Sequence, residues 1–368
     1  MKQLILSLKS GKINLIDIPI PIKSDNSILI QNTHSLISSG TEGSLINFGK
    51  KNLINKAIKE KDRLKIVYDK IKRDGLLSTF NAINDKLENQ IPLGYSSLGY
   101  VIESTNSKFK VGDRVISNGS HAEFVSVPVN LCHKVPSEVS SEDAVFTIIA
   151  SIGLQGVRAL DPKLGEVIVV YGLGLIGLIV CQILIANGCK VIGIDINEER
   201  VNLAKKYGVI SFKFENKEFK KKIIYNNSSD QGADGVLICA HTSNSSIIND
   251  SADFCRSEGR IVLLGSTPIS INRESFYKKQ IKFTVSSSYG PGRYDNNYEN
   301  GQDYPIGFVR WTLNRNFNEI LRLLDIKKIS FSALISNIYQ LKDYEKAYKN
   351  LNKSLGIIFN YNSSINSS

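Results

Sequence analysis

The chain has 368 residues and a formal net charge of +11, and 42% of its residues are hydrophobic. This length exceeds what a single hydrophobic core usually supports, so we expect two domains, with enough apolar residues for two cores. The net charge could indicate a nucleic-acid partner. However, Lys and Arg are concentrated between residues 50 and 73, where apolar residues recur at helical spacing. That pattern is typical of a surface helix with a solvated basic face, so we expect no nucleic-acid partner.

The five cysteines are scattered along the chain, and none are spaced as a CxxC pair. This distribution predicts reduced core residues of a cytoplasmic protein, with neither a disulfide framework nor a four-cysteine zinc lobe. The apolar run at residues 4–6 is too short for a signal peptide. The long uncharged stretch at residues 167–186 has a strand-like start and three glycines, so we expect no membrane-spanning helix there.

The first part of the chain predicts a small β-rich domain. Short strand-like runs separated by turn residues occur at residues 4–8, 13–18 and 28–32, and again at residues 98–104, 111–116 and 121–127. Helical periodicity interrupts this pattern over residues 44–90, and a second helical pattern covers residues 140–160. We therefore assign residues 1–147 to this domain, with residues 44–90 as a helical insert.

A glycine motif follows between a predicted strand and a predicted helix. The β-branched run at residues 167–171 leads into Gly172, and Gly174 and Gly177 complete the spacing GxGxxG. The first glycine permits a tight turn, the second lets the backbone approach a pyrophosphate, and the third lets the helix pack closely on the strand. The helix N-terminus also offers free N–H groups to the phosphates. These features predict a dinucleotide-binding βαβ unit.

The next predicted strand, residues 190–195, ends in Asp195, where a carboxylate can accept hydrogen bonds from the ribose hydroxyls. A carboxylate there would repel a 2′-phosphate, so the cofactor is predicted to be NAD rather than NADP. The alternative is that Asp195 only caps the end of the strand. Leu175 and Ile176 in the glycine motif and Arg200 in the following helix complete the predicted cofactor site.

Strands and helices continue to alternate after this unit. Buried strands are predicted at residues 233–239 and 259–265, with a helix between them. This alternation predicts an α/β fold with a doubly wound parallel Rossmann sheet covered on both faces. We assign residues 148–290 to this NAD-binding domain and residues 291–368 to a return segment that completes the sheet and the catalytic domain. The return segment is predicted to contain helices near residues 311–325 and 343–351 and a last strand at residues 356–361.

A β-rich domain, a dinucleotide fold and a return segment, in this order, resemble the medium-chain dehydrogenase/reductase superfamily. Residues 111–115 are similar to a motif of its GroES-like domain. Further segments resemble the dehydrogenase half of bi-domain oxidoreductases from bacterial surface-polysaccharide gene clusters; they are residues 35–42, 92–95, 117–123, 288–294 and 303–311. The resemblance implies a GroES-like domain here. In those proteins a glucose-fructose-oxidoreductase-type domain follows, so a separate partner of that type is possible.

The resemblance also implies a zinc-independent protein. Zinc-dependent members place a Cys, a His-Glu pair and a further Cys or Asp around the reacting oxygen. The corresponding positions here are Ser39, Tyr95, Ser96 and Ile148. Because these residues supply no thiolate and imidazole set for a tetrahedral ion, we expect no zinc and no other metal. Hydroxyl or imidazole donors must then stabilise the reacting oxygen.

Four residues are the candidate catalytic groups. Tyr95 comes first because it stands at a ligand position, and a phenol can donate a hydrogen bond and relay a proton; the alternative is a tyrosine in the core or in a cleft wall. His121 and His34 lie in the β-rich domain near segments expected to line the cleft, and either could instead be structural. Ser39, with Thr41, could orient substrate or nicotinamide, or could cap the adjacent turn.

The candidate substrate-binding residues are Thr41, Tyr289, Arg293, Tyr294 and Arg310. Arginines beside tyrosines suit a carboxylate, a phosphate or a sugar diphosphate, because a guanidinium donates two parallel hydrogen bonds to such groups. The alternative is a subunit or domain interface, where Tyr and Arg are also enriched.

These observations predict a cytoplasmic, zinc-independent, NAD-dependent oxidoreductase that transfers a hydride to or from a hydroxyl or carbonyl of a small polar substrate. The family context implies a sugar or nucleotide sugar used in surface-polysaccharide biosynthesis. The alternative is an NAD(H)-binding subunit without turnover that works with a separate sugar oxidoreductase. We expect a homo-oligomer and no membrane partner.

Overall fold

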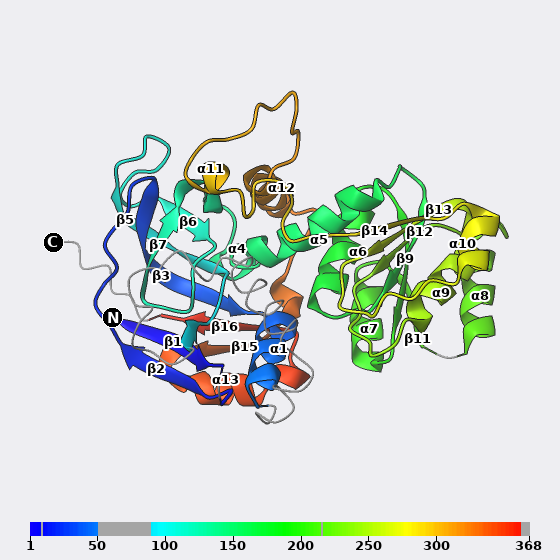
Figure 1. Cartoon of the computed structure of the whole chain (residues 1–368), viewed down its shortest axis with the longest axis horizontal. Coiled ribbons are helices and arrows are strands. Elements are labelled where there is room, and N and C mark those ends of the chain that lie inside the picture. Colours follow the sequence, from blue (N-terminus) through cyan, green and yellow to red (C-terminus); the bar gives the residue numbers. More distant parts are fainter. Residues whose placement is uncertain (9, 51–89, 215, 362–368) are drawn as a thin grey trace. The chain divides into compact units, whose positions relative to one another are not determined.

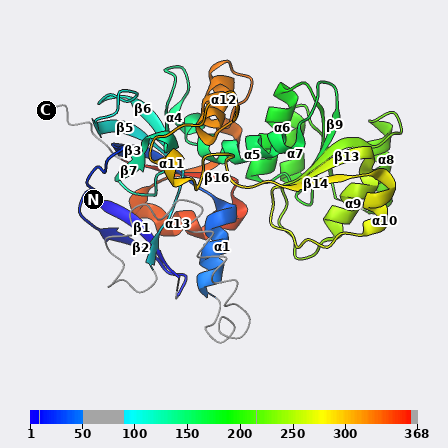
Figure 2. The same ribbon diagram turned by 45° about the horizontal axis from the view of Figure 1, so that its top comes forward.

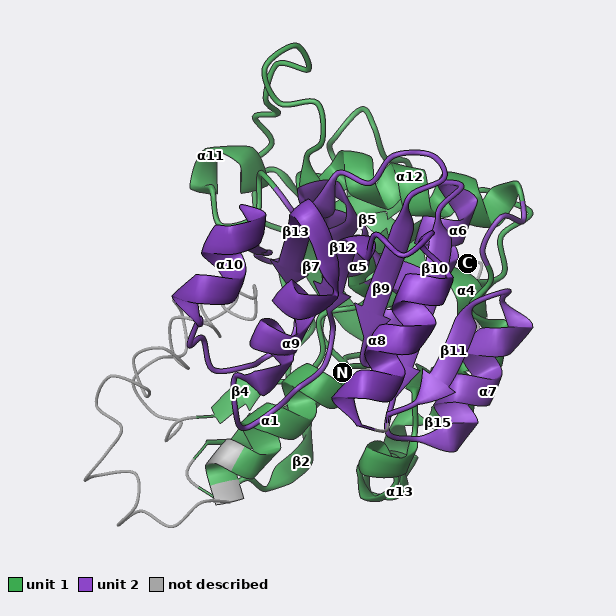
Figure 3. Ribbon diagram, turned by 90° about the vertical axis from the view of Figure 1, so that its right-hand side faces the viewer, with its two compact units in different colours: residues 1–149, 291–326, 330–368 green, residues 150–290, 327–329 purple. Residues whose placement is uncertain are grey.

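A computed structural model describes residues 1–8, 10–50, 90–214 and 216–361. Contacts divide the chain into two compact units (Figure 3): unit 1 comprises residues 1–149, 291–326 and 330–368, and unit 2 comprises residues 150–290 and 327–329. Unit 2 carries a parallel Rossmann sheet and unit 1 is β-rich, which confirms the predicted fold class. None of the described helices is both long and apolar enough to cross a membrane.

Unit 2 is built on a six-stranded sheet with parallel pairing throughout. Its strands, in spatial order, are β11 (Ile210–Lys213), β10 (Lys190–Asp195), β9 (Val167–Tyr171), β12 (Ala233–Ile238), β13 (Cys255–Leu263) and β14 (Lys282–Val285). The order in which successive strands are added to the sheet reverses between β9 and β12, as in the Rossmann order 3-2-1-4-5-6. Ligands of such sheets bind beyond the carboxyl ends of the strands, at the point where the strand order reverses. The fold therefore predicts a binding site at the carboxyl ends of β9 and β12.

Helices cover both faces of the unit 2 sheet (Figure 1). The described helices of this unit are α5 (Thr147–Leu160), whose first three residues belong to unit 1, α6 (Leu175–Ala186), α7 (Glu198–Lys206), α8 (Lys217–Asn226), α9 (Ser246–Phe254) and α10 (Arg273–Lys279). Ile224 of α8 and Phe254 of α9 pack with Val169 and Val236 in one apolar core. Because each central strand is covered on both sides, its residues form a continuous apolar run rather than an alternating pattern.

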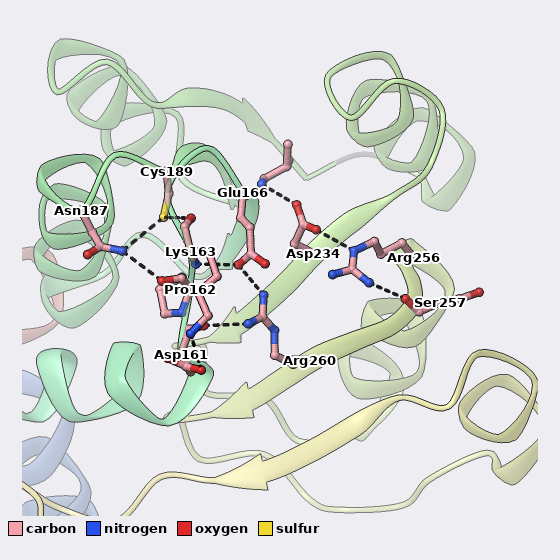
Figure 4. A network of polar contacts seen from close by, with 11 residues as sticks. Asp161, Pro162, Lys163, Glu166, Asn187, Cys189, Asp234, Arg256, Ser257 and Arg260 are labelled. Atoms are coloured by element: carbon pink, nitrogen blue, oxygen red, sulfur yellow. Dashed lines mark hydrogen bonds and ion pairs between the residues drawn. The ribbon is translucent and has the colours of Figure 1, made fainter.

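Charged side chains tie neighbouring strands together at the amino ends of β9, β12 and β13 (Figure 4). The Asp234 carboxylate accepts from Val167 N at 2.8 Å and from Arg256 Nε at 2.6 Å. Arg260 pairs with Glu166 in the same network. These charged groups pair with one another, so this end of the strands is structural and the opposite, carboxyl end carries the candidate site.

In its described residues, unit 1 contains two sheets. The smaller one joins β2 (Ile13–Asp17), β1 (Lys2–Ser7) and β4 (Gln90–Pro92), and the larger one has the order β15 (Ile335–Gln340), β16 (Gly356–Asn360), β3 (Ser27–Ile37), β5 (Ser97–Ser104), β6 (Arg114–Ser117) and β8 (Cys132–Lys134), with β7 (Phe124–Pro128) also paired to β3. The helix α13 (Tyr344–Lys349) lies beside β1 and β2 in both views (Figures 1 and 2). Its Tyr344 and Tyr348 pack against the core formed by Leu4 and Leu6.

Among the residues that the structure describes, the remaining α-helices of unit 1 are α1 (Ser39–Lys50), α4 (Ser141–Ala144), α11 (Asn296–Glu299) and α12 (Leu313–Asp325). Helix α1 begins before the predicted insert at residues 44–90, and residues 51–89 of that insert lie outside the described residues. The strand predicted at residues 111–116 begins only at Arg114, because Gly112 has a φ of +89° and forms a turn. The predicted helices near residues 311–325 and 343–351 and the last strand are present.

Candidate functional site

The glycine loop after β9 lies at the carboxyl edge of the unit 2 sheet. Gly172 has a φ of +88°, and a Cβ there would lie 2.8 Å from Ala240 N. A Cβ on Gly177 would lie 1.8 Å from Gly172 O, so α6 packs directly against the loop. A Cβ on Gly174 would meet no atom closer than Arg200 Nη1 at 4.0 Å. The fold therefore requires the first and third glycines, whereas Gly174 leaves open space for a ligand.

Helix α6 begins next to this open space. Gly174 is its N-cap and offers no side chain to accept hydrogen bonds from the first turn, where Leu175 and Ile176 are the first helical residues. The free N–H groups and the dipole of a helix N-terminus favour an anion. The loop and helix thus fit the pyrophosphate of a dinucleotide.

Asp195 ends β10 and is 8% exposed. Its Oδ2 accepts from Leu173 N at 2.6 Å, and its Oδ1 accepts from Asn197 N at 2.8 Å. The carboxylate therefore ties the glycine loop to the start of α7, so the capping role considered from the sequence is present. A carboxylate offers about four acceptor positions, so these two contacts leave capacity for ribose hydroxyls. Binding of the ribose by Asp195 remains a prediction.

In unit 1, Tyr95 and Thr41 lie next to each other. Tyr95 follows a turn at Gly94, whose φ is +87°. The Tyr95 hydroxyl is 3.4 Å from Thr41 Oγ1, in the first turn of α1. Ser39 is the first residue of the same helix and is half-buried. The fold thus brings two hydroxyl groups from distant segments together, which is an arrangement that can pass a proton.

His121 is completely buried in unit 1. Its Nδ1 lies 2.7 Å from Ser35 Oγ, and its Nε2 lies 3.3 Å from Oε2 of Glu42. Glu42 is a functional candidate that the sequence reasoning missed. Its carboxylate also accepts from Ser38 N at 2.9 Å and from the Tyr348 hydroxyl. The sequence did contain a signal, because Glu42 follows Ser38 by four residues at the start of a helix. In a capping box the acidic residue follows the serine by three residues, so the match is not complete.

His34 lies on β3 with other partners. Its Nδ1 is 3.0 Å from Thr33 Oγ1, and its Nε2 is 3.9 Å from Glu142 Oε1. Burial lowers the pKa of His34, against the opposing effect of Glu142. The catalytic role predicted for His34 stays a prediction.

The residues predicted to bind substrate belong to two different units. Arg293 is 2% exposed at its side chain, pairs with Glu299, and lies 4.6 Å from the centre of the Tyr294 ring. Arg310 is exposed and lies 4.0 Å from the centre of the Trp311 ring. The buried Tyr289 belongs to unit 2, whereas the other members belong to unit 1. The charge of Arg293 is therefore balanced by the protein itself, and Arg310 is the more available cation.

The residues at the zinc-ligand positions do not form a metal-binding set. Ser96 is buried and donates to Val145 O at 2.6 Å, and Ile148 is a buried apolar residue. Within the described ranges, no three His, Cys, Asp or Glu side chains are grouped in a way that could hold a metal ion. Hydroxyls and an aliphatic side chain are poor substitutes for the thiolate and imidazole ligands of zinc, so these residues do not fit that ion.

Comparison with known proteins finds a family model that matches most of unit 2. Residues 176–300 match the family model described as zinc-binding dehydrogenase. The match covers less than half of the chain. D-xylulose reductase A of Aspergillus oryzae is 24% identical over 247 residues, which cover 65% of this chain and 62% of that protein. The matched part thus spans less than two thirds of the length of this curated relative.

Solved structures share the fold over the whole chain. The 2R,3R-butanediol dehydrogenase of Bacillus subtilis has a TM-score of 0.72 and 18% identity, covering 98% of this chain and 99% of that one. An alcohol dehydrogenase of Escherichia coli CFT073, solved as a complex with NADH, has a TM-score of 0.72 and 17% identity, with the same coverage. At these identities the likeness shows the fold alone, in which a Rossmann-like unit accompanies a GroES-like unit.

The glycine geometry predicts different effects for two alanine substitutions. Gly177→Ala places a Cβ against a backbone oxygen, so we expect the melting temperature to fall by about 5 °C or more, as overpacking costs of about 1–3 kcal/mol imply. Gly174→Ala, the matched control, should leave the melting temperature within about 1 °C of the wild type while weakening NADH binding. Thermal unfolding and calorimetric titration measure both effects. Equal losses of stability would contradict the assigned roles of the two glycines.

Proposed function

We propose that this chain is an NAD-dependent oxidoreductase that transfers a hydride to or from a hydroxyl or carbonyl carbon of a small polar substrate without zinc. The observation that carries the proposal is the carboxyl edge of unit 2, where the open space at Gly174 and the Asp195 carboxylate lie beside the N-terminus of α6. The match of residues 176–300 to a dehydrogenase family supports it. The relatives named for xylulose and butanediol chemistry support an alcohol or polyol as the reacting group.

Different residues of unit 2 bind different parts of NAD. The backbone at Gly174, with the N–H groups of Leu175 and Ile176, suits the pyrophosphate, and Arg200 lies beside it. Asp195 accepts hydrogen bonds from the ribose hydroxyls. When bound, the nicotinamide supplies or accepts the hydride.

Hydroxyl groups of unit 1 donate or accept the proton of the substrate oxygen. The Tyr95 hydroxyl donates a hydrogen bond to the substrate oxygen and exchanges its proton with that oxygen, and Thr41 orients the phenol from 3.4 Å away. This pair takes the place that a metal ion has in zinc-dependent dehydrogenases, where the ion stabilises developing negative charge. Ser39, at the start of the same helix, contributes a further hydroxyl.

We propose a sugar or nucleotide sugar of surface-polysaccharide biosynthesis as the substrate. The resemblance of residues 288–294 and 303–311 to the polysaccharide-cluster proteins supports this class, as does the polyol chemistry named for the relatives. Arg310, exposed beside Trp311, is available for a phosphate group. A glucose-fructose-oxidoreductase-type partner and a homo-oligomeric state belong to the same proposal.

Cofactor choice tests the role of Asp195. NAD(H) should bind about tenfold or more tightly than NADP(H), because the carboxylate repels a 2′-phosphate. Asp195→Ala should bring the two affinities closer together. Asn197→Ala is the control, since it removes the N-cap of α7 and leaves the carboxylate in place. Calorimetric titration with both cofactors measures the ratio, and a wild-type preference for NADP(H) would refute the assignment.

Metal content tests the zinc-independent part of the proposal. Because hydroxyls and Ile148 stand at the ligand positions, protein purified and dialysed at neutral pH should retain well under one zinc per chain. Elemental analysis measures this directly, and treatment with a chelator should leave the melting temperature unchanged. One tightly held zinc per chain would show that other residues form a metal site.

The Tyr95 hydroxyl is tested by its removal. Tyr95→Phe should lower kcat by ~10²-fold, the scale of one positioned acid–base group, while NADH affinity stays near the wild-type value. Tyr100→Phe is the control, because it removes a different phenol from the same unit. Steady-state kinetics with a panel of polyols, sugars and nucleotide sugars provides the measurement. Unchanged turnover in Tyr95→Phe would move the catalytic role elsewhere. A wild-type protein that turns over no substrate, alone or with a sugar oxidoreductase, would instead favour the NAD(H)-binding subunit.

A further inference from the structure

A chain of hydrogen-bonded side chains runs through the interior of unit 1. Its members, in order of contact, are Tyr348, Glu42, His121, Ser35 and Tyr361. Ser35 and His121 have no exposed surface, and Glu42 is 1% exposed. A buried carboxylate and imidazole are unfavourable unless each polar atom has a partner, so their presence together in the core calls for a specific role.

The contacts determine which groups donate. The Glu42 carboxylate accepts from Ser38 N at 2.9 Å and from Tyr348, and burial with the nearby Glu42 raises the pKa of the Tyr348 hydroxyl, which therefore keeps its hydrogen. Since an ionised carboxylate only accepts, we assign a hydrogen to His121 Nε2, which lies 3.3 Å from Glu42 Oε2. Nδ1 can then accept from Ser35 Oγ at 2.7 Å. Both ring nitrogens are thus engaged inside the protein.

His121 also holds the turn that precedes Tyr95. Its backbone N donates to Leu93 O at 2.7 Å. Its ring lies so close to Gly94 that a Cβ on that glycine would be 2.6 Å from His121 Cγ. On the other side of the ring, Glu42 belongs to the first turn of α1 and binds its N-cap region through Ser38. The Glu42–His121 contact therefore joins the turn that carries Tyr95 to the helix that carries Thr41.

We propose that Glu42 and His121 are positioning residues that set the Tyr95 hydroxyl against Thr41. His121 exchanges no proton with the substrate, because neither ring nitrogen faces outward. This role differs from the catalytic one predicted from the sequence. The proposal rests on the proposed function of Tyr95. It implies that His121 affects turnover only by positioning the Tyr95 hydroxyl.

A double-mutant cycle tests this dependence. His121→Phe keeps an aromatic ring but removes the donor to Glu42, and it should lower kcat by about tenfold with little change in substrate KM or NADH affinity. In a Tyr95→Phe background the same substitution should change kcat by less than about twofold, since coupled residues give non-additive effects. His121→Gln, whose amide can still donate to Glu42, should recover part of the loss. His133→Gln, on β8, is the matched control and should leave kcat unchanged.

The pH–rate profile separates positioning from acid–base catalysis. A positioning residue lowers kcat at every pH and leaves the limbs of the profile in place, whereas loss of a catalytic acid or base removes a limb. A lost limb in His121→Phe, or additive effects of the Tyr95 and His121 substitutions, would overturn the proposal. If His121→Phe fails to give a cooperative thermal transition, Glu42→Gln removes the charge from the same contact and takes its place in the cycle.

A spectroscopic measurement keeps this test independent of turnover. Tyrosine labelled with ¹³C at Cζ gives one resonance for Tyr95, identified by its absence in Tyr95→Phe. That resonance should shift in both Glu42→Gln and His121→Phe and stay in place in His133→Gln. The ring ¹⁵N resonances of the four histidines should also show hydrogen on Nε2 of His121. A Tyr95 resonance that is unchanged in both variants would refute the positioning role, whereas the absence of turnover in the wild type would refute only the proposed function.

Discussion

The close approach of α6 to the end of β9 determines what unit 2 can bind. The helix can reach that strand only because Gly177 has no side chain to meet Gly172 O, and the loop between them can turn only because Gly172 adopts a positive φ. The N–H groups at the start of α6 are therefore presented at the sheet edge, next to the open space at Gly174. Asp195 fixes the neighbouring strand end by accepting from Leu173 N, so the glycine loop and the carboxylate are held together at this end of the strands.

In unit 1 the main constraint is the burial of ionisable side chains, because Glu42 and His121 need hydrogen-bond partners inside the protein. Three donors meet the Glu42 carboxylate, and one of them is the imidazole of His121. A fully satisfied network of this kind makes the surrounding structure more rigid, whereas one missing donor would leave a costly unpaired group. The same contacts that stabilise the buried carboxylate thereby orient the turn before Tyr95. Stability and site geometry in this unit depend on the same hydrogen bonds.

The sequence predicted the parts of this structure whose signals are local. The apolar strands β9, β10 and β12 and the glycines between β9 and α6 follow from periodicity and backbone sterics, so the Rossmann unit was accessible without coordinates. Strands β14 and β15 were missed because most of their residues are exposed or half-exposed and give no apolar run. The motif positions drew attention to Tyr95 and Thr41. The burial of His121 and its contact with Glu42 were not accessible, because they depend on segments far apart in the chain meeting in the folded core.

The pairing of β16 with β3 makes the folding of unit 1 depend on segments that lie far apart in the chain. Residues 150–290 of unit 2 are contiguous and contain all six strands of its sheet, so that sheet can form before residues Gly356–Asn360 have been synthesised. Unit 1, in contrast, must keep the edge of β3 unpaired until residues Gly356–Asn360 emerge. Ser35 and Tyr361, separated by 326 positions, make their hydrogen bond only then. The buried polar chain can therefore be completed only after residue 361 has been synthesised, whereas the strands of unit 2 are available earlier.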